Sequence, residues 1–68
     1  MKYAFFFLCF LSPTAIYDVR MTLDNEEDCR NIAKAIHDLL RPHLAVRGYD
    51  AEKVEKLLND NTKWVKIA

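Results

Sequence analysis

The chain has 68 residues, and its ten lysine and arginine side chains are balanced by ten aspartate and glutamate side chains. This neutrality excludes the strongly basic proteins that concentrate nucleic acid or anionic membrane by charge alone. With 51% hydrophobic residues, one glycine and two prolines, the composition indicates one compact globular domain over residues 1–68 rather than a disordered tail.

The most hydrophobic segment is an uninterrupted apolar run at positions 4–11, AFFFLCFL. One interpretation is the hydrophobic part of a signal peptide over residues 1–15, since Lys2 precedes the run and small residues follow it. Cleavage after Ala15 would place Pro13 three positions before the cut, where a small residue other than proline is needed. A short secreted protein therefore stays an alternative, whereas a membrane span would need about 20 apolar residues.

The preferred interpretation is a buried strand over residues 2–10, because aromatic side chains pack well on a pleated sheet. Both of its faces are apolar, which predicts a central strand covered on both sides. One face would carry Tyr3, Phe5, Phe7 and Cys9, and the other Ala4, Phe6, Leu8 and Phe10. Residues 12–14 predict a turn, and the alternation over residues 15–23 predicts a second strand with one wet face.

Two helices are expected next. Asp24 and Glu27 have the spacing of a capping box, and Pro42 disfavours helical geometry at Arg41, so the first helix is expected to end near Leu40. The apolar stripe of this helix is Cys29, Ile32, Ala33, Ile36, Leu39 and Leu40. Residues 43–49 predict a connector closed by a glycine. Residues 50–58 predict a second helix capped by Asp50, and residues 63–67 predict a short last strand.

These elements predict an α+β fold with the order β-β-α-α-β and a three-stranded sheet in the order 2-1-3. The last strand is expected to run parallel to the first, with both helices packed on one face of the sheet. The two helices can cover only one of the two apolar faces of residues 2–10, and the other stays uncovered. An uncovered apolar patch on a small protein usually marks an interface.

No residue pattern predicts a catalytic, cofactor or metal site. Cys9 and Cys29 are expected to be core thiols, and two thiols in an ordinary composition fit the reducing cytoplasm. His37 and His43 are six residues apart and do not share a helix face as a metal-binding pair would. His37 is expected on the solvent side, beside Asp38 or Lys34. The acidic segment 24–28 is interpreted as a helix start, with a contact patch as the alternative.

A domain this short buries only about 60% of its unfolded surface, so we expect self-association to add stability. The sequence therefore predicts a non-enzymatic protein-interaction module that forms a homodimer and binds a larger protein in the cytoplasm. An inhibitor or adaptor of the kind that phages encode would have this design. Interfaces concentrate their energy in tryptophan, tyrosine and arginine. The candidate partner-binding residues are accordingly Tyr49, Trp64, Arg47 and Arg20.

The second functional hypothesis is a nucleic-acid-binding accessory protein that uses the basic C-terminal third of the chain. Its candidate residues are Arg41, Arg47, Lys53, Lys56, Lys63, Lys66 and Trp64. Interleaved acidic side chains dilute the field of these cations. Neither nucleic acid nor a membrane is therefore the expected partner.

Overall fold

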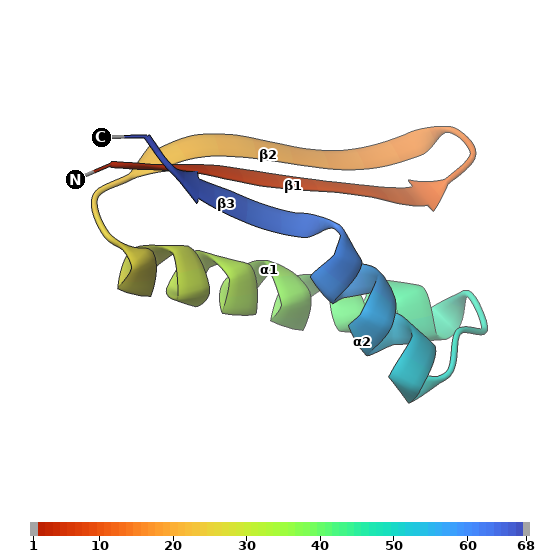
Figure 1. The fold of residues 1–68 in the computed structure, drawn as a ribbon. Coiled ribbons are helices and arrows are strands. Elements are labelled where there is room, and N and C mark those ends of the chain that lie inside the picture. Colours follow the sequence, from red (N-terminus) through yellow and green to blue (C-terminus); the bar gives the residue numbers. More distant parts are fainter. Residues whose placement is uncertain (1, 68) are drawn as a thin grey trace.

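The computed structural model describes residues 2–67 and shows an α+β fold in which a sheet lies over a layer of helices (Figure 1). The elements are β1 (Tyr3–Ser12), β2 (Ala15–Leu23), α1 (Glu26–Val46), α2 (Ala51–Asp60) and β3 (Thr62–Lys66). The three strands have the order β2-β1-β3, and both helices lie on one side of the sheet. The predicted fold class, element order and strand order are confirmed.

The direction of β3 was predicted wrongly, because β3 pairs antiparallel with β1. At about 1.5 Å per residue, the 21 residues of α1 carry the chain roughly 31 Å along the sheet. The ten residues of α2 bring it only part of the way back. After Asn61 the chain continues in the same sense, so β3 begins opposite Phe7, in the middle of β1, and ends opposite Tyr3. The short second helix thus makes β3 antiparallel.

Helix α1 extends six residues beyond its predicted end at Leu40, and Pro42 lies inside it. The proline has no N–H, so the carbonyl of Asp38 loses its usual helical donor. Leu44, one turn beyond Leu40, is completely buried in the core, and this burial favours the added turn. The helix ends before Gly48, whose φ of +94° lies in the left-handed region that glycine adopts without strain.

The two helix caps show how local side chains set the helix starts. Asn25, rather than the predicted Asp24, caps α1, and its side-chain oxygen accepts the N–H of Asp28 at 2.8 Å. Asp24 instead pairs with Lys2 at the start of β1, and this hydrogen bond lowers the pKa of the carboxyl group. Asp50 caps α2 as predicted. Side-chain acceptors at these positions satisfy N–H groups that have no helical partner.

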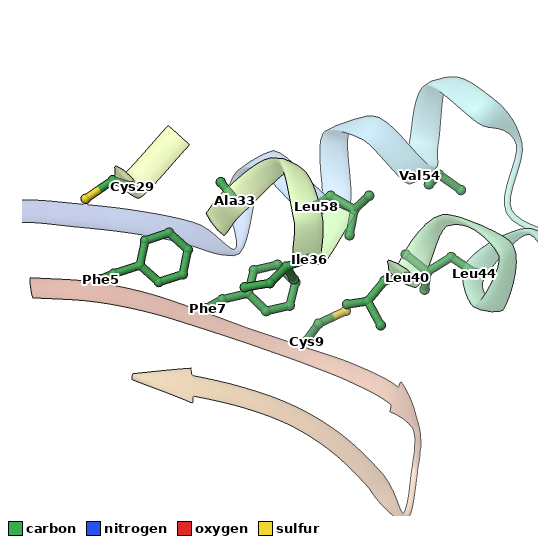
Figure 2. Close-up of a cluster of buried hydrophobic side chains, with 10 residues drawn as sticks. All are labelled: Phe5, Phe7, Cys9, Cys29, Ala33, Ile36, Leu40, Leu44, Val54 and Leu58. Atoms are coloured by element: carbon green, nitrogen blue, oxygen red, sulfur yellow. The ribbon is translucent and has the colours of Figure 1, made fainter. Parts of the chain in front are cut away.

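The hydrophobic core is one layer between the sheet and the helices (Figure 2). It consists of Phe5, Phe7, Cys9, Cys29, Ala33, Ile36, Leu40, Leu44, Val54 and Leu58. The first of the two predicted faces of β1 therefore lies in the core. The expectation that β1 is covered on both sides is wrong, because Phe6 on the second face is 42% exposed.

Candidate functional site

The candidate functional site is the face of the sheet that points away from the helices. We call it the open sheet face and define it by five exposed apolar side chains: Phe6, Leu8, Phe10, Ile16 and Val65. Exposure rises along β1, from 42% at Phe6 and 45% at Leu8 to 64% at Phe10. The strand spacings give this face an area on the order of 400 Å², within the range of patches that are often functional in small proteins.

The strand register makes the open sheet face continuous. Phe6, Leu8 and Phe10 follow one another on the same side of β1, at intervals of two residues. Phe10 lies opposite Ile16 of β2, and Ala4 lies opposite Val65 of β3. The face is therefore an apolar stripe along the central strand, widened at each end by a neighbouring strand.

Charged side chains border this stripe. Arg20 of β2 and Lys63 of β3 lie on opposite sides of Phe6, while Asp18 lies beside Leu8. The Nε of Arg20 is 3.6 Å from an oxygen of Asp18, so the two charges on β2 form an exposed ion pair. An apolar centre with a charged rim is the usual anatomy of a protein–protein interface.

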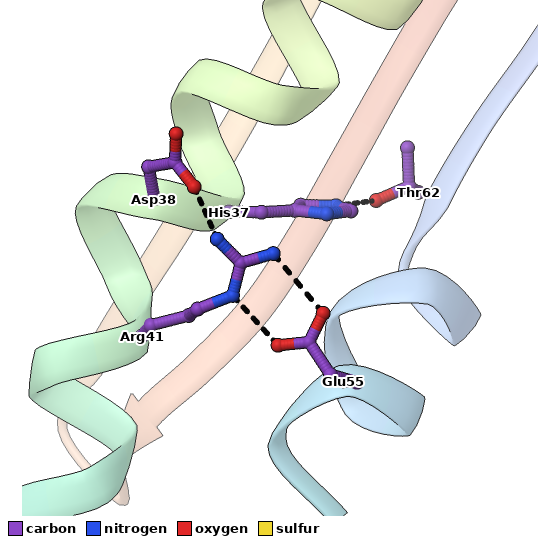
Figure 3. A network of polar contacts seen from close by, with 5 residues as sticks. All are labelled: His37, Asp38, Arg41, Glu55 and Thr62. Carbon is purple, nitrogen blue, oxygen red and sulfur yellow. Dashed lines mark hydrogen bonds and ion pairs between the residues drawn. The ribbon is translucent and has the colours of Figure 1, made fainter. Parts of the chain in front are cut away.

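A polar relay joins α1 to the corner between α2 and β3 (Figure 3). Nε2 of His37 lies 2.7 Å from Oγ1 of Thr62, and Thr62 donates its hydroxyl hydrogen to the carbonyl of Leu58 at 2.7 Å. Since that hydrogen is already used, the imidazole donates from Nε2. His37 is 8% exposed, so its predicted place on the solvent side is wrong. Burial, together with the charge of Arg41, lowers the pKa of His37.

A guanidinium fork connects the two helices beside this relay (Figure 3). Arg41 donates from Nε to one oxygen of Glu55 at 2.6 Å and from Nη2 to the other at 3.0 Å. Its Nη1 also contacts Asp38. The hydrogen bonds from Arg41 lower the pKa of Glu55, and those to Glu55 raise the pKa of Arg41. This fork positions α2 against α1, and its polar atoms are already paired.

The four predicted partner-binding residues do not form one site. Arg20 is exposed on the rim of the open sheet face, whereas Trp64 is half-buried on the opposite side, with its ring 6.1 Å from that of Phe5. Tyr49 lies in the turn between α1 and α2, where the ammonium group of Lys53 is 5.3 Å from the centre of its ring. Arg47 is exposed at the end of α1. Tyr49 also lines a shallow, open hollow on α2 of about 310 Å³.

The cations of the nucleic-acid hypothesis are dispersed over the surface. Arg41 is held by two carboxylates, and Lys56 pairs with Asp60 at 3.0 Å. Lys63 lies on the open sheet face, while Trp64, its neighbour in β3, packs toward the core. Lys53 and Lys56 line the hollow beside Tyr49, and the nucleic-acid hypothesis stays a prediction.

The thiols lie in the core. Cys9 and Cys29 are free and buried, and burial raises the pKa of both. A buried thiol with a raised pKa is a poor nucleophile. Within residues 2–67, no group of three or more histidine, cysteine, aspartate or glutamate side chains is arranged to hold a metal ion.

Reasoning from the sequence predicted that one apolar face of residues 2–10 stays uncovered and marks an interface, but it did not say which face, and it chose candidate partner-binding residues elsewhere. The second face of β1 was recognised as apolar, and Ile16 stood on the side of β2 that was predicted to be wet. The buried place of His37 had a signal as well. It lies four residues after Ala33 and three before Leu40, which is the spacing of the buried helical stripe.

No protein-family model, curated protein or solved structure matches this chain. No helix within residues 2–67 is long and apolar enough to cross a membrane.

Proposed function

We propose that the protein is a non-enzymatic interaction module that binds a larger protein through its open sheet face. The observation that carries this proposal is the exposure of Phe6, Leu8 and Phe10 in one continuous row on the central strand. Apolar surface that is removed from water contributes about 25 cal/mol per Å². Contact with a flat, apolar surface of a partner would therefore stabilise the complex along the whole stripe.

The sheet is well suited to binding a protein because its shape is already formed before the partner binds. The covered side of β1 is anchored in the core by Phe5, Phe7 and Cys9, so the side chains between them are presented on a rigid strand. A preformed surface loses little conformational entropy on binding. This favours an inhibitor or adaptor that acts by occupying a surface of its target.

The predicted anchors enter the proposal in two ways. Arg20 lies on the rim of the open sheet face and would set the orientation of the partner. Tyr49 and Arg47, near the turn between the helices, are a separate contact point that a large partner could reach. Trp64 would contribute indirectly, because its ring stacks on Phe5 on the core side of the sheet and holds β1 in place.

The proposal includes self-association and a cytoplasmic location. The small size of the 8.0 kDa chain supports self-association, because so short a domain buries little of its own surface and gains stability from a second copy. Two free thiols are compatible with a reducing compartment.

The proposal is tested by affinity capture from the native host with matched variants. Phe6→Thr combined with Leu8→Thr makes the open sheet face more polar while keeping residues that favour strands. The control is Leu39→Thr combined with Val46→Thr, which removes two exposed apolar side chains from α1. A partner lost by the first variant and retained by the control supports the proposal. Equal capture by both variants contradicts it.

A further inference from the structure

The outward edge of β2 carries backbone groups that are free to pair. The carbonyl of Lys2 accepts from Ile67, and the N–H of Leu8 donates to Asn61, so the even-numbered residues of β1 bond to the β3 side. Because backbone groups alternate in direction along a strand, the odd-numbered residues of β1 bond to β2. Phe7 lies opposite Val19, so the N–H and C=O groups of the odd-numbered residues of β2 point toward β1. The residues of β2 whose N–H and C=O groups point outward are Ile16, Asp18, Arg20 and Thr22.

This edge has few of the features that usually protect an outer strand. Natural sheets guard their edges with short strands, charged side chains (especially lysine), proline or bulges. The opposite edge has two of these features, since β3 has five residues and includes Lys63 and Lys66. In contrast, β2 has nine residues and contains neither proline nor lysine, and its two charged residues, Asp18 and Arg20, have opposite signs.

The helix layer also stops short at β2. Tyr17, Val19 and Met21 point to the helix side, yet each is only half-buried, whereas Phe5, Phe7 and Cys9 on the central strand are buried. The apolar layer is therefore incomplete at the same strand whose backbone edge is open. Both observations indicate that the sheet continues beyond β2.

We propose that a second copy of this chain continues the sheet by pairing its own β2 antiparallel to this one. The two-fold axis passes between the two Val19 residues, and the dimer has a continuous six-stranded sheet. The inference rests on the self-association included in the proposed function and names the surface that performs it. It assigns the β2 edge to the second copy and leaves the open sheet face to the larger partner.

The charges on β2 select this register. When the two strands overlap over their full length, Ala15 lies opposite Leu23 of the second copy. Asp18 then lies opposite Arg20 of the second copy, and the symmetry repeats this pair. Opposite charges that face each other across strands are stabilising, and like charges in that position are destabilising. A slip of two residues in either direction would place Asp18 opposite Asp18 or Arg20 opposite Arg20.

The same register satisfies the backbone and completes the apolar layer. Each outward residue of β2 would donate its N–H and accept at its carbonyl, because even-numbered residues then face even-numbered residues. On the helix side, Tyr17 would lie opposite Met21 of the second copy, and the two Val19 side chains would meet. A slip of one residue would turn these side chains to the wrong face.

The test is sedimentation equilibrium of the full chain with charge-reversal variants. We expect the wild-type protein to have twice the 8.0 kDa mass of one chain at about 100 μM. Asp18→Arg or Arg20→Asp places like charges opposite each other twice and should weaken the dimer at least about tenfold. The double variant D18R/R20D restores opposite charges and should restore the dimer. Lys63→Glu, on the other edge of the same sheet face, is the control and should leave the dimer unchanged.

Amide hydrogen exchange separates this dimer from one formed through the open sheet face. The amides of Ile16, Asp18, Arg20 and Thr22 should become protected as the protein concentration rises. A monomer at about 100 μM, or a dimer in which these amides stay unprotected and neither charge reversal has an effect, overturns the inference. Phe6→Thr should leave the β2 dimer in place, so loss of the larger partner and loss of the dimer are distinguishable outcomes.

Discussion

His37 donates a hydrogen bond across the boundary between α1 and β3, with its Nε2 2.7 Å from Oγ1 of Thr62. Thr62 in turn donates a hydrogen bond to the carbonyl of Leu58, whose side chain packs α2 into the core. One hydroxyl group therefore joins α1 to the junction of α2 and β3, across 25 residues of sequence. Removing that hydroxyl leaves a buried donor and a carbonyl without their partner.

We expect Thr62→Val to lower the free energy of unfolding by about 1–3 kcal/mol, the usual cost of an unsatisfied buried polar group. Thr62→Ser keeps the hydroxyl and is the matched control. Urea denaturation followed by circular dichroism measures both. Equal stability of the two variants would show that the relay contributes nothing.

The relay also predicts how stability depends on pH. Burial and the nearby Arg41 lower the pKa of His37 below its ordinary value of 6.5, so the folded state holds the imidazole in its neutral form. The unfolded chain binds a proton more readily, and the stabilisation present above pH 6.5 is lost as the pH falls below this value. The carboxyl groups facing His37, on Asp38 and Glu55, oppose this shift without reversing it.

His37→Gln retains an N–H donor where Nε2 lies and cannot titrate. Urea midpoints measured between pH 5 and 7 should fall toward acid for the wild-type protein and change less for this variant. Parallel curves for the two proteins would exclude His37 as the source of the pH dependence.

Substitution of Gly48 is expected to lower stability through its backbone conformation alone, not through a steric clash. Its φ is +94°, and a Cβ atom added there meets no other atom within 4 Å. Gly48→Ala should cost about 1–2 kcal/mol, because an L-residue is strained at this angle. Thermal unfolding measures the loss, and an unchanged midpoint would mean that the turn between the helices adapts at no cost.

The two faces of β1 should differ sharply in their tolerance of truncation. Phe7→Ala removes a core side chain and should cost about 3–5 kcal/mol, a large part of the stability of so small a domain. Phe6→Ala, on the open sheet face, should cost less than half as much. Denaturant titration of the two variants compares them directly, and equal losses would contradict the one-sided core.

The architecture was predictable because alternation and helical spacing are strong in this chain. The apolar residues of β1 indicated a central strand, and the polar alternation of β2 indicated its outer neighbour. The predictions that were wrong concern details that depend on packing between residues distant in sequence. Pro42 signals a helix end locally, but Leu44 has a place in the core that only the folded chain supplies.

The direction of β3 and the site were harder to predict for a similar reason. Strand direction depended on α2 being much shorter than α1, and Pro42 made α1 appear shorter than it is. Which face of β1 stays open depends on where two helices pack, and both faces look alike in sequence. The predicted anchors Tyr49 and Trp64 were chosen by residue type, and the structure places them apart.

Site-specific photocrosslinking in the native host tests most directly whether the open sheet face binds a protein. A photoreactive phenylalanine analogue is placed at Phe10, which is 64% exposed on that face, or at Leu39, which is exposed on α1. We expect the analogue at Phe10 to form a covalent adduct with one larger protein, and the analogue at Leu39 to form none. An adduct with the same protein from Leu39 but none from Phe10 would contradict the assignment of the open sheet face as the binding surface.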